Sequence, residues 1–349
     1  MLALQAVTPA RLVERVPELT LAEARKLIAQ VHRGEPVAAS SSVRAVAVAA
    51  VRAVGCVPEL AVVDESASRI DPFVKYVCES GGARFETVRI PLENPERFTA
   101  CVSSQVGCAL GCAFCATGRL GLARNLASWE IVEQVRVVRA RLPRGRVHGV
   151  VFQGMGEPLA NLDAVLEAIA VMTEPCALAI DARAITVCTA GLPVGIRRLA
   201  IEAPRVRLGL SVSSAIAAHR RRVMPIAERH ELAEVLDATA FHARTTGLAP
   251  MWALTLLDGI NDSDADAHVL VERVQAFEAA TGVRPRISIV AYNSIAAADP
   301  FARSSRETAF RGVLAEAKLA SHRRYSGGGD VGAACGQLAN TLATVPPQR

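Results

Sequence analysis

Aromatic residues and lysine are scarce in this chain of 349 residues, and no apolar segment is long enough to span a membrane. Phe, Trp and Tyr together make up 4% of the chain. The apolar stretch from Val46 to Val57 is interrupted by Arg52 and is too short to cross a bilayer. The N-terminus lacks a basic segment followed by a sustained apolar core, so we expect no signal peptide. We therefore expect a cytoplasmic protein without a membrane anchor.

Charge and cysteine content also argue against a secreted protein. The nine cysteines do not form the pattern of a disulfide framework in a chain of this length. The net charge is +5, and nearly all basic residues are arginine, which is compatible with RNA as a partner but does not require it. Hydrophobic residues make up 51% of the chain, enough for two domains or for one large α/β domain with an extension.

Three closely spaced cysteines are the most informative feature of the chain. Cys108, Cys112 and Cys115 follow the spacing C-x3-C-x2-C, and Cys101 lies seven residues upstream. Thiolates are soft ligands that suit iron–sulfur clusters or zinc. A 4Fe–4S cluster ordinarily takes four cysteines, so three ligands leave one iron open. An open iron is what an enzyme needs to bind S-adenosylmethionine (SAM) and cleave it to a 5′-deoxyadenosyl radical.

A zinc site, a set of unrelated thiols and a ferredoxin all fit this cysteine pattern less well. A structural zinc site needs four ligands, with Cys101 as the fourth, and such sites usually consist of two spaced pairs. Unrelated buried thiols would not lie in a glycine-rich loop. An electron-transfer ferredoxin would be shorter and would carry a second cysteine group. The loop glycines are Gly107, Gly111, Gly118 and Gly121.

Alternating strands and helices are predicted after about residue 95. Strands are expected at 98–103, 148–153, 184–188, 206–212, 250–257 and 286–291. Helices are expected at 128–141, 161–173, 193–201, 229–245, 264–281 and 305–320. This order predicts an α/β fold with a parallel sheet covered by helices, and six units form a partial barrel rather than a closed one. Active-site residues are then expected at the carboxyl ends of the strands.

The first 93 residues predict a smaller accessory unit. Helical periodicity covers 10–33, where Thr20 and Glu23 have the spacing of a capping box, and a second helix is expected at 43–54. Strand-like runs follow at 60–63, 73–78 and 85–91, with Gly81-Gly82 as a hairpin turn. We therefore divide the chain into an N-terminal unit (1–93), a core (94–329) and a C-terminal segment (330–349).

Two further motifs carry candidate functional residues. Gly154-Met-Gly-Glu-Pro158 follows an apolar strand, so its glycines allow a ligand to approach the backbone and Glu157 could accept hydrogen bonds from an ammonium group. An ordinary turn with a solvated glutamate is the alternative. Cys335 lies in a glycine-rich segment that could move it into a site, whereas most free cysteines are simply buried small residues.

From about Gly81 to Leu338 the chain resembles the radical-SAM RNA adenine methyltransferases of the RlmN and Cfr type. The resemblance rests on FETVRIP (85–91), CVSSQVGCALGCAFCATG (101–118), GMGEP (154–158), LSVS (210–213), MPI (224–226), YN (292–293) and GGGDVGAACGQL (327–338). A terminal ACGQL cysteine is not a general feature of radical-SAM enzymes, so the ordered set is specific. It implies the radical-SAM partial (β/α)6 barrel with a small N-terminal α/β extension.

The resemblance also implies roles for individual residues. Cys108, Cys112 and Cys115 would hold one 4Fe–4S cluster. SAM, two molecules per turnover, would be held by Gly156, Glu157, Cys188, Ser211, Val212, Ser213 and Asn293. Cys335 would carry the methyl group, Cys101 would be its disulfide partner, and Glu86 would accept the ring proton. The implied reaction is methylation of an adenine carbon, carbon 2 in 23S rRNA being favoured.

The implied partners are RNA and an electron donor such as flavodoxin, and we expect a monomer. Some alternatives stay open at this point: carbon 8, a tRNA or a peptide as acceptor, or an Fe–S or zinc-stabilised RNA-binding protein without turnover. Arginine-rich stretches could contact phosphates or could form solvated helix faces. These stretches are Arg136–Arg146, His219–Arg229 and His322–Arg324.

The chain departs from the family pattern in three places. The usual S-T-S-G turn reads Cys188-Thr-Ala-Gly191, and the usual S-L-H reads Ser211-Val-Ser213. These two changes affect residues near SAM. The N-terminal extension is short for the family, which leaves the RNA target open. Both reactive cysteines and Glu86 are present, so the departures do not imply loss of activity.

Overall fold

A ten-stranded sheet forms the centre of the molecule in the computed structural model, which describes residues 1–295 and 299–338. The strand order is β14-β13-β12-β11-β10-β9-β6-β5-β4-β3. Seven of these strands, from β6 to β14, pair in parallel. They are β6 (Arg97–Cys101), β9 (Arg146–Phe152), β10 (Ile185–Thr189), β11 (Arg207–Ser211), β12 (Met251–Leu256), β13 (Arg286–Ala291) and β14 (Ser321–Arg324).

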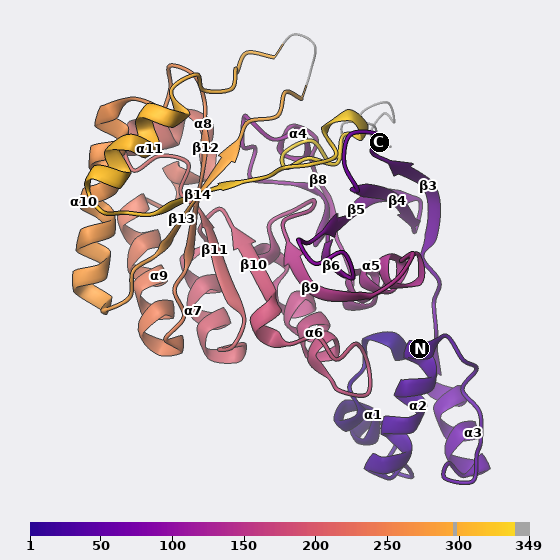
Figure 1. Ribbon diagram of the computed structural model, residues 1–349. Coiled ribbons are helices and arrows are strands. Elements are labelled where there is room, and N and C mark those ends of the chain that lie inside the picture. Colours follow the sequence, from indigo (N-terminus) through magenta and orange to yellow (C-terminus); the bar gives the residue numbers. More distant parts are fainter. Residues whose placement is uncertain (296–298, 339–349) are drawn as a thin grey trace.

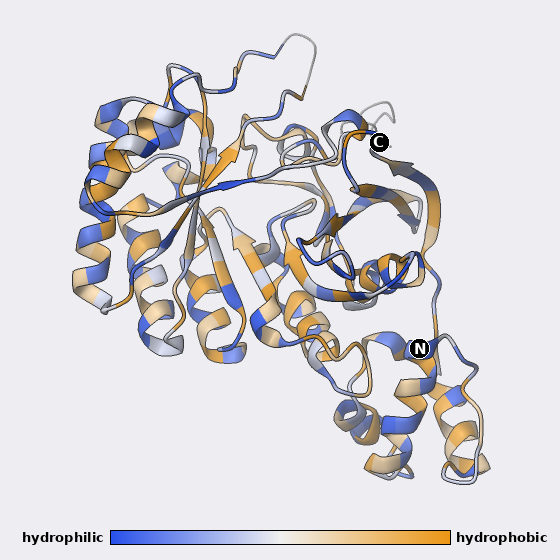
Figure 2. Ribbon diagram, viewed as in Figure 1, coloured by the Kyte–Doolittle hydropathy of each residue, from blue (hydrophilic) through white to orange (hydrophobic). Residues whose placement is uncertain are grey.

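Six long helices alternate with these strands and cover the outside of the curved sheet (Figure 1). They are α5 (Ser128–Ala140), α6 (Leu162–Thr173), α7 (Pro193–Glu202), α9 (Leu232–Thr246), α10 (Asp264–Thr281) and α11 (Glu307–Glu316). Each lies where the apolar periodicity predicts a helix, and the α/β partial barrel is confirmed. β14 is an additional strand that the hydrophobic pattern does not indicate, because its sequence is polar (Figure 2).

An antiparallel hairpin extends the parallel sheet at its other edge. β3 (Ala61–Ala67), β4 (Val74–Ser80) and β5 (Ala83–Pro91) pair in order, and β5 pairs with β6. Gly81 and Gly82 form the expected turn with φ of 56° and 73°, which favours glycine. The domain boundary predicted after residue 93 therefore falls between two paired strands, and the hairpin packs in the main core.

The first 56 residues form a helical unit with an apolar core of its own. It contains α1 (Pro9–Arg15), α2 (Leu21–Arg33), α3 (Ala45–Val54) and the paired short strands β1 (Leu2–Ala3) and β2 (Gly55–Cys56). The helical periodicity over 10–33 corresponds to two helices, α1 and α2, because Pro17 lacks an N–H group and the hydrogen bonding of α1 ends before it. The capping box of Thr20 and Glu23 starts α2 as expected.

Short elements surround the open end of the barrel. They are β7 (Gln105–Cys108), β8 (Gly121–Asn125), α4 (Ala116–Arg119), α8 (Ala217–Val223) and the 3-10 turns η1 (Leu4–Ala6), η2 (Pro158–Asn161), η3 (Ala182–Ala184), η4 (Pro225–Glu228) and η5 (Gly329–Val331). β7 and β8 pair as a separate two-stranded sheet. No helix in the described part of the chain has the length and hydropathy to cross a membrane.

The segment after β14 crosses the open side of the barrel to the hairpin, as its yellow ribbon shows in Figure 1. The Tyr325 hydroxyl and the Gly328 amide both donate to Asp71, each at 2.8 Å. Further along, Asp330 accepts from the Ser68 hydroxyl at 2.7 Å. These contacts join the two edges of the ten-stranded sheet and place Cys335 at the mouth of the barrel.

Candidate active site at the carboxyl ends of the strands

One cavity lies at the carboxyl ends of the parallel strands and brings most of the candidate residues together. It contains about 1010 Å³ of space not filled by atoms, part of it open to solvent. Ten candidates line it: Cys108, Cys112, Cys115, Gly156, Glu157, Cys188, Ser211, Ser213, Asn293 and Cys335. Three candidates do not: Glu86, Cys101 and Val212. The motifs therefore converge in space although they are spread over more than 200 residues.

The cysteine loop is a tight turn between β7 and α4. Cys108 ends β7, Cys115 is the N-cap of α4, and the Cys115 amide donates to the Cys112 carbonyl at 3.1 Å. A Cβ atom at Gly118 would lie 2.9 Å from the Cys112 nitrogen, so this close approach requires glycine. The Ala113 amide donates to the Val223 carbonyl at 3.0 Å, which attaches the loop to α8.

The donor set of this loop fits a cluster better than a single metal ion. All nine cysteines are free thiols. Burial raises the pKa of Cys108 to about 11 and also raises the pKa of Cys112 and Cys115, because a buried thiolate without a cation is poorly solvated. Bound iron would reverse this preference. Among the described residues, no three His, Cys, Asp or Glu side chains converge on one metal position. Ligands of a cluster need not converge, since each binds a different iron.

The Gly154–Pro158 turn is shaped by contact with β7. Gly156 has a φ of 96°, and a Cβ atom there would lie 2.5 Å from Cβ of Gln105. The Gln105 side chain accepts from the Glu157 amide at 2.8 Å. The Glu157 carboxylate accepts from the amides of Ala190 at 2.8 Å and Leu159 at 3.0 Å, and burial raises its pKa. A carboxylate can accept up to about four hydrogen bonds, so Glu157 retains capacity to accept from a ligand in the cavity.

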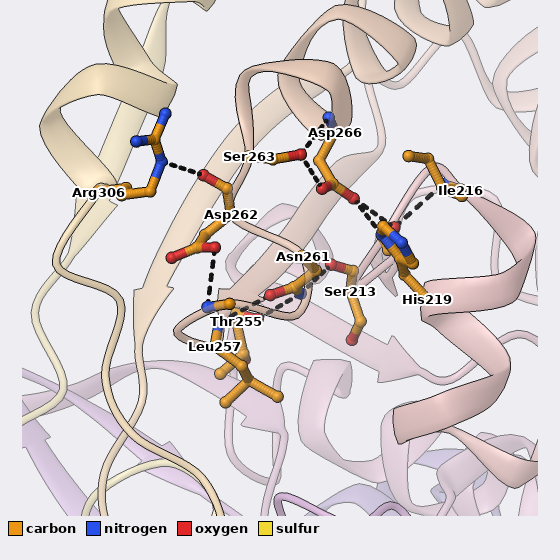
Figure 3. A network of polar contacts seen from close by, with 12 residues as sticks. Ser213, Ile216, His219, Thr255, Leu257, Asn261, Asp262, Ser263, Asp266 and Arg306 are labelled. Atoms are coloured by element: carbon orange, nitrogen blue, oxygen red, sulfur yellow. Dashed lines mark hydrogen bonds and ion pairs between the residues drawn. The ribbon is translucent and has the colours of Figure 1, made fainter.

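A polar network behind β11 and β12 holds the strand ends in place (Figure 3). Ser213 has a positive φ of 57°, which is uncommon for a residue with a side chain. The Asn261 amide nitrogen donates to the Ser213 carbonyl at 2.6 Å and to the Thr255 carbonyl at 2.9 Å. Asp266 accepts from His219 at 2.8 Å in the same network. The network thus fixes the turn that presents Ser211 and Ser213 to the cavity.

Val212 lies in this turn but contributes to it through its backbone. Its side chain is buried in the main core, and its amide donates to the Ala253 carbonyl at 2.9 Å. The predicted contact of Val212 with SAM can therefore involve only main-chain atoms.

Asn293 and Ser326 hold the segment that carries Cys335. The Asn293 amide nitrogen donates to the Cys335 carbonyl and to the Ser326 hydroxyl, each at 3.1 Å. Ser326 in turn accepts from the Cys335 amide at 2.8 Å. The Ala116 amide also donates to the Gly336 carbonyl at 2.7 Å, which joins this segment to the cysteine loop. The sequence motifs do not single out Ser326.

Glu86 is fully buried and forms an ion pair with Lys75, whose Nζ lies 3.1 Å from Oε1 of Glu86. Val88 pairs with Cys101 across β5 and β6, and Glu86 lies two residues before Val88. The side chains of Glu86 and Cys101 therefore point to the same face of the sheet. A Cβ atom at Gly332 would lie 3.4 Å from the Lys75 Nζ, so the C-terminal segment covers this pair. Sequence reasoning missed Lys75, although a lysine within an apolar strand is an unusual signal.

Cys101, Cys188 and Cys335 lie around the guanidinium of Arg324 at the end of β14. Although burial lowers it, the pKa of Arg324 is raised by the neighbouring thiols of Cys335, Cys188 and Cys101. Burial together with the neighbouring Cys335 raises the pKa of Cys101 to about 12. Cys101 is buried and does not line the cavity. The sequence indicates Arg324 only as a candidate phosphate contact, and its position inside the barrel follows from the pairing of β14.

The other arginine-rich stretches also make contacts within the protein. Arg136 donates to the Val31 carbonyl at 2.9 Å and so connects α5 to the helical unit. Arg220 is 1% exposed beneath the cysteine loop. Arg221 and Arg222 of the same helix are exposed and could still face a phosphate backbone.

Comparisons with known proteins agree with this site. Residues 102–269 match the model of the Radical SAM superfamily. A protein called "probable RNA methyltransferase" from Sorangium cellulosum is 55% identical, over 93% of this chain and 89% of its own length. The "dual-specificity RNA methyltransferase RlmN" of Syntrophobacter fumaroxidans is 44% identical, over 74% of this chain and 73% of its own.

A solved structure extends the similarity to the whole fold. The crystal structure of a radical SAM methyltransferase from Sphaerobacter thermophilus has a TM-score of 0.85 and 32% sequence identity. It covers 97% of this chain, and the alignment includes all of that protein. The similarity therefore extends over nearly the whole chain.

Proposed function

Because the chain belongs to the radical SAM RNA methyltransferases, an RlmN-like family whose members use a 4Fe–4S cluster and SAM, we propose that it methylates carbon 2 of an adenine in 23S rRNA through a methyl group carried on Cys335. One observation carries this proposal: Cys335 lines the same cavity as Cys108, Cys112 and Cys115. A methyl group on its sulfur would lie where a radical formed at the cluster can reach it.

The arrangement of the cavity supports specific roles in binding. Cys108, Cys112 and Cys115 would hold the cluster, whose fourth iron stays open. Gly156, Glu157, Cys188, Ser211, Ser213 and Asn293 would bind SAM, together with the backbone of Val212. When bound, the cluster and SAM supply a 5′-deoxyadenosyl radical and a methyl group. Two SAM molecules per turnover are needed, one as methyl donor and one as radical source.

Three residues would then complete the reaction. The Cys335 sulfur would carry the methyl group, and the carbon of that group, after losing one hydrogen atom, would bond to the adenine ring. Glu86 would accept the ring proton, and the electron left on the adduct would return to the cluster. The Cys101 thiolate would then attack the Cys335 sulfur, the methylene carbon would leave and take up a proton to become the product methyl group, and a disulfide would remain. Glu86 is covered by the C-terminal segment, so this segment has to shift when RNA binds. An external reductant, such as flavodoxin, supplies the electrons that reduce the cluster.

The proposed target is tested by mapping methylated adenines in RNA. We expect that deleting the gene removes one 2-methyladenosine from 23S rRNA, and that the purified enzyme restores it in vitro. Mass spectrometry of nuclease fragments identifies the nucleotide and the methylated carbon. A lost 8-methyladenosine, or a loss confined to tRNA, would assign the same chemistry to another acceptor. Unchanged RNA would contradict the proposal.

Substitution of Lys75 by methionine is expected to block the step that uses Glu86. Without its counter-charge the buried carboxylate is costly to keep ionised, and removing one partner of a buried ion pair costs about 3–5 kcal/mol of stability. RNA methylation should fall by about 10²-fold or more, the range of general-base catalysis. Methylation of Cys335, measured by peptide mass spectrometry, should continue near the wild-type rate.

Two further variants separate this catalytic effect from a loss of stability. Lys75→Arg keeps the charge and should recover much of the RNA methylation. The double variant Lys75→Met/Glu86→Gln removes both charges, so it should regain stability but not activity. If the double variant methylated RNA at the wild-type rate, Glu86 would not be the proton acceptor.

A further inference from the structure

Arg220 in α8 is a buried cation that lacks an anionic partner among the described residues. Its side chain is 1% exposed. Nε donates to the Val212 carbonyl at 3.2 Å and Nη2 donates to the Ala190 carbonyl at 2.6 Å, both neutral acceptors. Nη1 has no hydrogen-bond partner within the part of the chain that the structure describes. Burial lowers the pKa of Arg220 only to about 10, so the guanidinium is charged at neutral pH.

The cysteine loop packs directly on this part of α8. The Val223 carbonyl, one turn after Arg220, accepts from the Ala113 amide at 3.0 Å. Val223 and Met224 share a small apolar cluster with Leu110, Cys112 and Phe114. Of the three loop cysteines, Cys112 is the one in this apolar cluster, and a negative charge on its sulfur would raise the pKa of Arg220.

A buried charge without a partner is destabilising, and proteins normally pair such charges. As a thiol, Cys112 carries no charge and cannot serve as a partner for Arg220. It becomes negatively charged when it loses its proton to bind iron. We propose that Arg220 is the counter-charge of the cluster, compensating the negative charge that the Cys112 thiolate and its cluster bring into the barrel. This inference rests on the assignment of Cys108, Cys112 and Cys115 as cluster ligands.

Two consequences follow from a fixed positive charge beside the cluster. Cluster binding should stabilise the protein more strongly when Arg220 is present. Reduction of the cluster adds a further negative charge, so Arg220 should also make the cluster easier to reduce. Arg220 would act as a positioning and electrostatic residue and would not touch the RNA.

The test compares the full-length protein before and after anaerobic reconstitution with iron and sulfide. Each variant is measured for bound iron, for the gain in melting temperature on reconstitution, and for the midpoint potential followed by electron paramagnetic resonance. Arg220→Met should show a smaller gain in melting temperature and a more negative potential than wild type. Arg220→Met lacks the hydrogen bonds to Val212 and Ala190 both before and after reconstitution. Their loss therefore does not contribute to the gain in melting temperature measured within each variant.

Two matched variants complete the experiment. Arg221→Met removes an exposed arginine from the same helix, one whose guanidinium lies 3.4 Å from the Glu231 carboxylate, and should behave as wild type. Arg220→Lys keeps the charge and should recover most of the difference. If Arg220→Met does not fold or takes up no iron, Arg220→Lys decides: restored uptake supports the proposal, and failure to restore it overturns it.

The outcomes also distinguish this inference from the cluster assignment itself. If Arg220→Met binds a full cluster with the wild-type gain in melting temperature and the wild-type potential, Arg220 is not the counter-charge. If Cys112→Ala still holds a complete cluster, the ligand assignment has failed instead, whatever Arg220→Met shows.

Discussion

Replacing Cys112 by alanine is expected to abolish both the iron–sulfur cluster and the cleavage of SAM. Cys108, Cys112 and Cys115 line one cavity from a single loop, and the other two thiols of that cavity, Cys188 and Cys335, lie on other elements. Cys101, seven residues upstream, does not line the cavity. Cys108→Ala and Cys115→Ala should have the same effect. Iron and sulfide analysis, visible absorption and the yield of 5′-deoxyadenosine measure the loss.

The chain provides controls for this prediction in three cysteines outside the site: Cys56, Cys78 and Cys176. Cys176 is the best matched, because it is half-buried, its thiol donates to Glu174 at the end of α6, and it packs against the core of the helical unit, away from the cavity. Cys176→Ala should keep the full iron content and normal SAM cleavage. If any one of Cys108→Ala, Cys112→Ala or Cys115→Ala retained a complete cluster and cleaved SAM normally, the assignment would be refuted.

The parallel core could be predicted because its signals are local. Six strands are short apolar runs that end in turns, and each is followed by an amphipathic helix of ten or more residues. The elements that sequence patterns miss are short or polar, such as β14 and α8, and tertiary contacts hold them in place. β14, for example, is a strand because it pairs with β13, although its sequence is Ser-His-Arg-Arg. The break at Pro17 is visible in the sequence but is masked by the regular apolar pattern around it.

The site could be predicted only where its residues form contiguous motifs. The cysteine loop and the Gly154–Pro158 turn are such motifs, and both line the cavity. Lys75, Arg220, Arg324 and Ser326 act through partners that are distant in sequence. Each is a charged or polar residue that the fold removes from full solvent exposure: Lys75 and Arg220 are buried, and Arg324 and Ser326 are half-buried. Burial is a property of the complete fold, so no local pattern distinguishes Arg220 from the exposed Arg221 beside it.

Replacing Cys101 by alanine is expected to trap the enzyme on its RNA, whereas Cys335→Ala should prevent any attachment. Without Cys335 no sulfur can carry the methyl group, so the cluster should remain but no methylated RNA should form. Without Cys101 the methyl group can be taken up and joined to adenine, but no thiol attacks the Cys335 sulfur. Turnover should therefore stop at a covalent link between Cys335 and RNA. Denaturing gels with labelled RNA, followed by peptide mass spectrometry, would detect it.

Cys188 is a candidate substitute for Cys101 and has to be removed in a parallel experiment. Both thiols interact electrostatically with Arg324 and raise its pKa. If Cys188 can resolve the adduct, Cys101→Ala will release product slowly and only Cys101→Ala/Cys188→Ser will trap the RNA fully. Serine keeps the size of the side chain but cannot form a disulfide. A double variant that methylates RNA at the wild-type rate without an adduct would overturn the paired-cysteine mechanism.

The pH dependence of product release gives an independent check on Cys101. Burial raises the pKa of this thiol to about 12, and only the thiolate attacks a sulfur atom. At pH values below this pKa, the thiolate fraction therefore increases about tenfold with each rise of one pH unit. Release of RNA from a preformed adduct should accelerate between pH 7 and pH 9 in the wild-type enzyme, as measured by rapid quench and denaturing gels. A release rate that is independent of pH would show either that another group deprotonates Cys101 before the attack or that another nucleophile resolves the adduct.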